Sequence, residues 1–182
     1  MVGAAATCGD GLVLGMADVF DHLPALTGVR GRMELAATLP NGAAAYVDYA
    51  HTPDALERLL TALRSHTHGK LIVVFGAGGD RDRGKRPLMG DAAARLADRA
   101  IVTDDNPRSE DPASIRAAIL ASCPGALEIG DRTQAIEAGL TLLGQGDVLV
   151  VAGKGHEQGQ TIGTTVIPFD DVSVIRRLAG VA

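Results

Sequence analysis

The sequence is poor in aromatic residues and in positive charge, and each shortage excludes a class of protein. Aromatic side chains make up 3% of the 182 residues and Trp is absent, so the core has to be built from Ala, Val, Leu and Ile. A formal net charge of −5 leaves no basic face of the kind on which nucleic-acid affinity rests. We therefore expect a small-molecule partner and no nucleic acid.

Cysteine and long apolar runs are also scarce. Cys8 and Cys123 are isolated thiols without motif spacing, which favours a reducing cytoplasm over a disulfide framework. No cluster of metal ligands is visible. The apolar runs Leu71–Val74 and Val148–Ala152 are too short to span a bilayer, and Met1–Gly15 lacks the basic start of a signal peptide. We expect a soluble cytoplasmic protein with no membrane partner.

The chain does have the length and apolar content for one full core. At 182 residues and 46% hydrophobic content, one domain with a small accessory segment is the default. Residues 1–29 show helical fragments at Val2–Cys8 and Met16–Leu26, interrupted by glycines. These residues are therefore interpreted as an incomplete element that precedes a domain at residues 30–182.

The start of this domain carries two local signals. Alternating apolar residues at 33–37, the turn Pro40-Asn41-Gly42 and the run Ala43–Tyr49 predict a β-hairpin. Thr52, followed by a proline and an acid, predicts a helix start with a capping hydroxyl.

Strands then alternate with helices. The predicted strands are Leu71–Phe75, Ala100–Thr103, Leu127–Ile129 and Val148–Ala152, and the helices between them are placed near Leu88–Leu96, at Pro112–Ala121 and from Asp131 to Leu143. Such alternation demands right-handed crossovers and a sheet covered on both faces. The predicted fold is α/β, a doubly wound, mostly parallel Rossmann-like sheet with an N-terminal β-hairpin. A strand at Thr165–Ile167 and a helix at Val172–Leu178 are expected to close one edge.

Polar side chains collect after four of these strands. The four loops are Asp48-Tyr49-Ala50-His51, Gly76–Arg86, Asp104–Arg108 and Gly153–Glu157. Because the carboxyl ends of parallel strands share one edge, where ligands bind, we expect the four loops to line one site.

The loop Gly76–Arg86 resembles two phosphate motifs and completes neither. Arg81 stands where G-x-G-x-x-G needs its last glycine, and the G-x-x-x-x-G-K stretch ends in Arg86, which cannot supply the P-loop hydroxyl to magnesium. The loop is predicted to present arginines to a carboxylate or phosphate. The alternative is that these arginines pair with Asp80 and Asp82 on a solvated loop.

The loops Asp104–Arg108 and Gly153–Glu157 carry groups suited to an amino acid. An arginine fork fits a carboxylate, and Asp and Asn can bind an ammonium group. The alternatives are an Asx turn that caps the next helix and a glycine turn with solvated charges. His51 is either a ligand contact or a structural donor, and His66 and His68 are assigned to a helix end, with no metal role.

Five runs of the sequence together resemble the Mur ligases. They are Gly31-Arg32-Met33-Glu34, Asp48-Tyr49-Ala50-His51-Thr52-Pro53, Gly79–Pro87, Asp105-Asn106-Pro107-Arg108 and Gly153-Lys154-Gly155-His156-Glu157. The Asp-Asn-Pro-Arg run is similar to that of members that add meso-diaminopimelate rather than lysine. The resemblance, from about Val29 onward, implies an ATP-dependent amide ligase that adds meso-diaminopimelate to UDP-N-acetylmuramoyl-L-alanyl-D-glutamate (the UDP-MurNAc-dipeptide) in peptidoglycan synthesis. Residues 30–182 would be its C-terminal substrate-binding domain, and residues 1–29 a remnant of its central ATPase domain.

The resemblance also implies roles for individual residues. The amino acid would be held by Arg81, Asn106, Arg108, Gly153 and Glu157, with Asp105 and Pro107 shaping the motif. Arg32, Asp48 and His51 would lie on the ATP side, Asp48 toward the ribose and Arg32 toward the phosphates. ATP and Mg²⁺ would serve the full-length enzyme, and no catalytic or metal-ligating residue is expected in this chain, which alone would be inactive.

Two departures from the family pattern keep alternatives open. The nucleotide-sugar domain and the P-loop-bearing ATPase domain are absent, and Gln158-Gly159-Gln160 stands where some members place an aromatic residue. The alternatives are a non-catalytic amino-acid binding module and a related ligase that adds lysine or glutamate.

Overall fold

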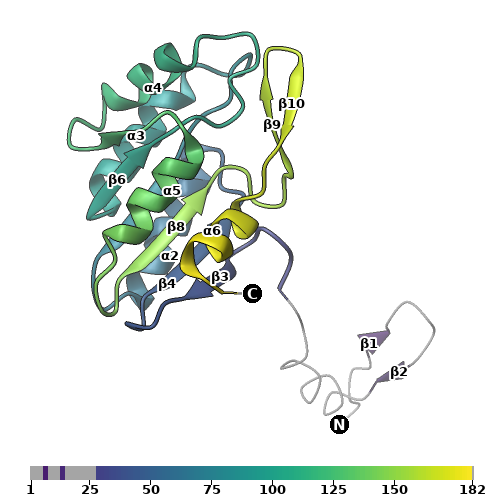
Figure 1. The fold of residues 1–182 in the computed structure, drawn as a ribbon, viewed down its shortest axis with the longest axis vertical. Coiled ribbons are helices and arrows are strands. Elements are labelled where there is room, and N and C mark those ends of the chain that lie inside the picture. The colour runs from purple at the N-terminus through teal and green to yellow at the C-terminus, as the bar shows by residue number, and fades with distance from the viewer. Residues whose placement is uncertain (1–5, 8–12, 15–27, 182) are drawn as a thin grey trace.

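The computed structural model describes residues 6–7, 13–14 and 28–181 (Figure 1). Two short strands, β1 (Ala6–Thr7) and β2 (Val13–Leu14), pair antiparallel. The helix expected at Val2–Cys8 is therefore wrong at Ala6 and Thr7, and the one expected at Met16–Leu26 lies outside the described residues. The assignment of residues 1–29 to another domain stays a prediction.

Six strands form the central sheet in the order β3-β4-β8-β5-β6-β7. Their bounds are β3 Glu34–Thr38, β4 Ala44–Asp48, β5 Leu71–Phe75, β6 Arg99–Val102, β7 Leu127–Glu128 and β8 Val148–Ala152. β3 pairs antiparallel with β4, and every other neighbouring pair is parallel. The doubly wound, mostly parallel sheet with an N-terminal hairpin is confirmed.

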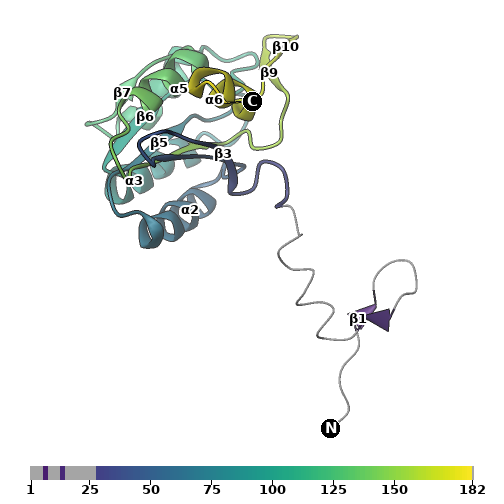
Figure 2. The same cartoon turned by 60° about the horizontal axis from the view of Figure 1, so that its bottom comes forward.

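Helices from the described part of the chain cover both faces of this sheet (Figure 2). They are α2 Pro53–His66, α3 Lys85–Leu96, α4 Pro112–Leu120, α5 Arg132–Thr141 and α6 Asp171–Ala179. Helices α2, α3 and α4 pack on one face and α5 and α6 on the other, so alternate residues of β5 point into different cores. Burial on both faces explains why the central strands are continuously apolar.

Local capping signals set most helix starts where the sequence predicted them. The Thr52 hydroxyl accepts from the Ala55 backbone N–H at 3.3 Å, and the Asp131 carboxylate accepts from Gln134 at 2.8 Å. Helix α3 begins at Lys85, three residues before the predicted start. Its N-cap Gly84 makes no side-chain capping bond, so no capping signal in the sequence marked this start. No helix within the described ranges has the length and apolarity to cross a bilayer.

The tail differs from the prediction in one respect. The expected strand exists as β10 (Thr165–Pro168), but it pairs with β9 (Gly159–Ile162), which was not predicted, and not with the central sheet. The two strands stand beside the body as a separate hairpin (Figure 1). Only α6 approaches an edge strand, where Arg176 Nε donates to the Ala36 carbonyl oxygen of β3 at 3.3 Å.

Candidate functional site

The four polar loops line one cavity at the carboxyl edge of the sheet. Strands β4, β8, β5 and β6 run parallel, so their carboxyl ends meet there. The cavity has a volume of about 440 Å³. Its lining consists of Tyr49, His51, Thr52, Gly78, Arg81, Asp82, Lys85, Asp105, Asn106, Arg108, Gly153 and Glu157. The expectation that the four loops meet is confirmed, since all four contribute residues to this cavity.

Most of the candidate site residues reach this cavity. Of the residues expected to hold the amino acid, Arg81, Asp105, Asn106, Arg108, Gly153 and Glu157 line it, and of those expected on the ATP side, His51 does. Pro107, Arg32 and Asp48 do not line it. Five further lining residues, Tyr49, Thr52, Gly78, Asp82 and Lys85, were not singled out from the sequence, although all lie in or directly beside the loops that it marked.

A close approach of two loops shapes the cavity floor. The Gly79 N–H donates to the Asn106 carbonyl oxygen at 2.9 Å, and a Cβ added to Gly79 would overlap the Pro107 carbonyl oxygen. Only glycine permits this distance between backbones. Pro107 therefore shapes the site through its backbone and not as a lining residue.

Two arginines offer unused donors to the cavity. The Nη1 of Arg108 donates to the carbonyl oxygens of Gly79 at 2.8 Å and Asn106 at 3.4 Å. The exposed Arg81 donates only to the Asp80 carbonyl oxygen, at 3.1 Å. Since a guanidinium has five N–H groups, both side chains keep donors that nothing in the described part of the chain occupies. They are suited to bind an anionic group.

The other two arginines of the loop Gly76–Arg86 serve a structural purpose. Arg86 is 3% exposed and forms a fork on Glu110, with distances of 3.1 and 2.9 Å, and Arg83 reaches the same carboxylate at 3.1 Å. The Arg86 hydrogen bonds hold the pKa of Glu110 down at about 2.

The alternative pairing of these arginines with Asp80 and Asp82 is wrong. Among the described residues no ion pair joins them, and the Asp80 carboxylate instead accepts from the Ser109 N–H at 3.1 Å and hydroxyl at 2.7 Å. These bonds lower the pKa of Asp80. Asp80 therefore ties its loop to the segment after Arg108.

A buried lysine lies directly behind the cavity. Lys154 has no exposed side-chain surface, and its Nζ donates to Asn106 Oδ1 at 3.0 Å and to the Gly159 carbonyl oxygen at 2.6 Å. Glu157 Oε2 lies 3.5 Å from the same Nζ. Burial lowers the pKa of Lys154, and the nearby Asp105 carboxylate opposes this shift. Sequence reasoning missed this role, since a lysine between two glycines has the pattern of a solvated turn.

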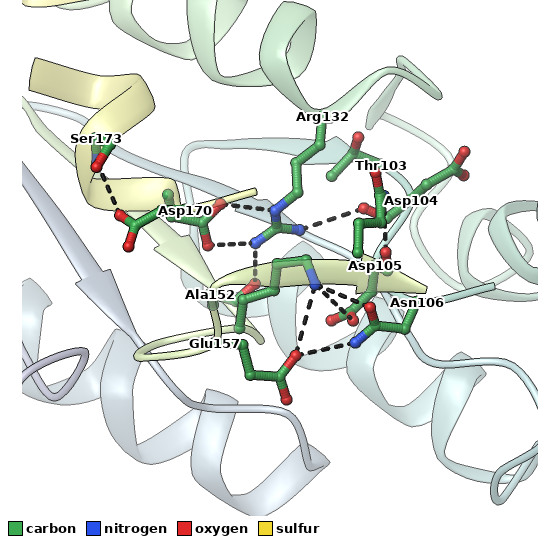
Figure 3. Close-up of polar contacts among 12 residues, drawn as sticks. Thr103, Asp104, Asp105, Asn106, Arg132, Ala152, Glu157, Asp170 and Ser173 are labelled. Atoms are coloured by element: carbon green, nitrogen blue, oxygen red, sulfur yellow. Dashed lines mark hydrogen bonds and ion pairs between the residues drawn. The ribbon is translucent and has the colours of Figure 1, made fainter. Parts of the chain in front are cut away.

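A second buried cation, Arg132, joins two strand ends (Figure 3). Arg132 and Asp171 both have 0% exposed side chains, and their two hydrogen bonds are 2.8 Å long. The guanidinium also donates to the carbonyl oxygens of Ala152 at 3.1 Å and Asp104 at 3.4 Å. These carbonyls lie at the carboxyl ends of β8 and β6, on either side of β5. Arg132 therefore fixes the ends of these two strands, from which two of the site's loops begin, relative to each other. No sequence signal had indicated this role.

The proposed ATP side is connected to the cavity through Tyr49. The Arg32 guanidinium lies 4.7 Å from the Tyr49 ring centroid, and the His51 ring lies 4.6 Å from it. Asp48 accepts from the Met33 N–H and the Ala50 N–H, both at 2.8 Å. Each carboxylate oxygen keeps acceptor capacity beyond these bonds. The ATP-side roles of Arg32, Asp48 and His51 stay predictions.

No group of three or more His, Cys, Asp or Glu side chains suited to a metal ion occurs in the described ranges. Cys123 is a buried free thiol.

Comparison with known proteins gives one consistent answer. The family profile "Mur ligase, glutamate ligase domain" matches residues 31–155. The UDP-N-acetylmuramoyl-L-alanyl-D-glutamate--2,6-diaminopimelate ligase of Caulobacter vibrioides is 65% identical over 166 residues, which are 91% of this chain and 34% of the relative. The ligase of the same name from Zymomonas mobilis is 56% identical over 174 residues, which are 91% of this chain and 36% of the relative.

Solved structures agree. A UDP-N-acetylmuramoyl-L-alanyl-D-glutamate--2,6-diaminopimelate ligase superposes with a TM-score of 0.78 at 44% identity, over 88% of this chain and 33% of that one. The UDP-N-acetylmuramate-alanine ligase of Thermotoga maritima, at 21% identity and a TM-score of 0.62 over 91% of this chain and 33% of its own, shares the fold. The chain spans about a third of the length of these relatives. Because the family profile matches more than half of the chain, the chain belongs to the Mur ligase family.

Proposed function

We propose that this chain is the diaminopimelate-binding C-terminal domain of a ligase that adds meso-diaminopimelate to UDP-N-acetylmuramoyl-L-alanyl-D-glutamate. The observation that carries the proposal is the gathering of Arg81, Arg108, Asn106 and Glu157 around one cavity of about 440 Å³. These residues come from three loops that are far apart in the sequence. Their charges complement a small molecule with carboxylate and ammonium groups.

The second carboxylate of diaminopimelate accounts for the choice between it and lysine. Arg81 and Arg108 have free N–H donors that can form charged hydrogen bonds, each worth about 1.5–3 kcal/mol. Two such bonds give on the order of 10² to 10⁴ in discrimination. Lysine would leave an arginine facing a bare carbon, whereas Glu157 and Asp105 can accept from an ammonium group.

In this proposal the domain positions the attacking amine. ATP phosphorylates the glutamyl γ-carboxylate, and the free-base amine of diaminopimelate attacks the acyl phosphate, so that an amide forms and phosphate leaves. Catalysis of this kind depends on positioning and on stabilising transferred charge. Arg32, Asp48 and His51 would face ATP from this chain, with Asp48 toward the ribose and Arg32 toward the phosphates.

The rest of the machinery is assigned to the preceding two thirds of the ligase. The described residues hold no cluster of three or more His, Cys, Asp or Glu side chains, and in this proposal the residues that bind Mg²⁺ belong to the preceding domains. The UDP-MurNAc-dipeptide would likewise bind mainly to the preceding domains. We place the ligase in the cytoplasm, where ATP is available and a thiol such as Cys123 stays reduced.

The proposal is tested by amide formation in a full-length ligase that carries this chain, joined where needed to the preceding two thirds of the Caulobacter relative. Product is expected with diaminopimelate, at a kcat/KM on the order of 10² or more above that with lysine. The chain alone should give no turnover. Equal use of lysine, or turnover by the isolated chain, would overturn the proposal, and tight calorimetric binding of diaminopimelate by a ligation-inactive protein would favour an amino-acid binding module.

A further inference from the structure

The side-chain amide of Asn106 has almost all of its hydrogen-bonding capacity committed to the protein. Its Oδ1 accepts from Lys154 Nζ at 3.0 Å and from the Thr161 N–H at 2.8 Å. Its Nδ2 donates to Glu157 Oε2 at 3.0 Å. An amide has two acceptor sites and two N–H donors, so one N–H is left without a partner among the described residues.

The partners also fix which way the amide faces. Rotating it by half a turn would bring its NH₂ against the donors of Lys154 and Thr161, and its oxygen against the Glu157 carboxylate. Three hydrogen bonds would be replaced by three mismatches, in surroundings where an unpaired polar group is costly. Figure 3 shows the Asn106 amide directed at Glu157.

We propose that Lys154 is a positioning residue, which acts through Asn106 and Glu157 and makes Asn106 a pure donor toward the ligand. This inference rests on the proposed function. Lys154 has no exposed side-chain surface and so does not touch the ligand itself. Its ammonium group and the Thr161 N–H together occupy both acceptor sites of Asn106 Oδ1. Among the described residues, the unpaired N–H of Nδ2 is therefore the only side-chain group that Asn106 can offer to the cavity.

This arrangement divides the site between the two charges of an amino acid. Asn106 joins Arg81 and Arg108 in binding a carboxylate, although the residue type alone would also suit an ammonium group. Glu157 has its Oε2 turned to Asn106 and Lys154, while Oε1 has no partner within the described ranges. The ammonium group of the ligand is therefore assigned to Glu157 Oε1.

The same lysine connects the site to the β9–β10 hairpin. Lys154 Nζ donates to the Gly159 carbonyl oxygen at 2.6 Å, next to the Thr161 N–H that shares Asn106 Oδ1. Gln160 Nε2 donates to the Asp105 carbonyl oxygen at 2.7 Å. The hairpin thus serves as the rear support of the run Asp105–Arg108, and Lys154 fixes it there.

The test is Lys154→Met in the full-length ligase described above, with steady-state kinetics for each substrate. Methionine keeps an unbranched side chain of similar length and removes its charge and donors. The KM for diaminopimelate should rise roughly 10- to 100-fold, while the KM for ATP stays within about twofold. Lys70→Met is the matched control, since Lys70 is exposed at the amino end of β5, and it should change neither KM.

A double-mutant cycle separates positioning from general damage. If Lys154 acts through Asn106, then Lys154→Met should add less than about twofold to the KM of an Asn106→Ala variant. The inference would be overturned if the two substitutions raised the KM for diaminopimelate independently, so that the double variant showed the product of the two single increases. It would also be overturned if Lys154→Met left that KM unchanged. If circular dichroism shows that Lys154→Met is unfolded, the cycle is run with Lys154→Gln, which keeps an N–H donor. A parent ligase that does not use diaminopimelate as a substrate would instead contradict the proposed function. A failure of the proposed function is therefore distinguishable from a failure of the role given to Lys154.

Discussion

Two pairs of cations around the cavity differ in how many of their donors the protein uses. Arg81 and Arg108, at the cavity wall, donate only to one or two backbone carbonyls each. Lys154 and Arg132, behind the wall, have no exposed side-chain surface and are surrounded by carboxylate, amide and carbonyl acceptors. The wall pair has capacity left for a ligand, and the buried pair has little.

This difference indicates a division of labour. A buried charge is tolerated only when its surroundings pair it, so the buried cations hold backbone and side chains in one arrangement. A partly exposed guanidinium loses less when unpaired, because water can solvate it. The buried pair therefore supports the shape of the site, and in the proposed function the wall pair would supply the affinity for the ligand.

The largest expected effect comes from breaking the buried Arg132–Asp171 ion pair. Arg132→Met leaves Asp171 buried without its partner, and the free energy of unfolding should fall by about 3–5 kcal/mol. Chemical denaturation monitored by circular dichroism measures this change. The double variant Arg132→Met/Asp171→Leu, which removes both charges, should lose less. A double variant that is no more stable than the single one would contradict the account of Arg132 as a charge-paired tie.

A change in the wall pair should affect binding and spare stability. Arg108→Ala should lower kcat/KM for diaminopimelate about 10²-fold, because it removes one or two charged hydrogen bonds. The KM for ATP and the thermal unfolding midpoint should change little. Arg108→Lys is the control, since it keeps the charge and loses the planar fork. If Arg108→Ala raised the KM for ATP as much as the KM for diaminopimelate, the role given to Arg108 would be refuted.

A smaller effect is expected on the ATP side. Asp48→Ala should raise the KM for ATP by about tenfold, the value of one hydrogen bond to a charged group, and change the KM for diaminopimelate less. Asp48→Asn keeps an acceptor for one of the two backbone N–H groups and serves as the control for folding. If the KM for diaminopimelate rose more than that for ATP, Asp48 would belong to the amino-acid side.

The smallest expected effect concerns acid stability. The pKa of Glu110 is held at about 2, against an ordinary value of 4.5. A depressed pKa contributes stability that is complete above the unfolded value and is lost as pH falls from about 4.5 toward 2. Thermal unfolding midpoints across this range should therefore fall less steeply for Glu110→Gln than for the parent. Parallel curves would show that the Arg86–Glu110 pair does not contribute.

Local structure was predictable wherever a short stretch of sequence carries its own signal. The continuous apolar runs of β5 and β8, the turn before β4 and the caps Thr52 and Asp131 each act within a few residues. The β9 strand could not be predicted in this way. Its Gly159–Ile162 segment is short and carries no apolar alternation, and it is held by partners in the run Asp105–Arg108 and by β10.

The sequence by itself determined the fold class and which loops carry the site, because periodicity and the parallel sheet together bring the carboxyl ends of four strands to one edge. It also marked most of the residues that line the cavity. Only the tertiary structure decided that Arg86 binds Glu110, that Arg132 joins two strand ends and that Lys154 lies behind Asn106. The reason is physical: the role of a charged side chain depends on its burial and on partners distant in the chain, and neither is encoded in its neighbours.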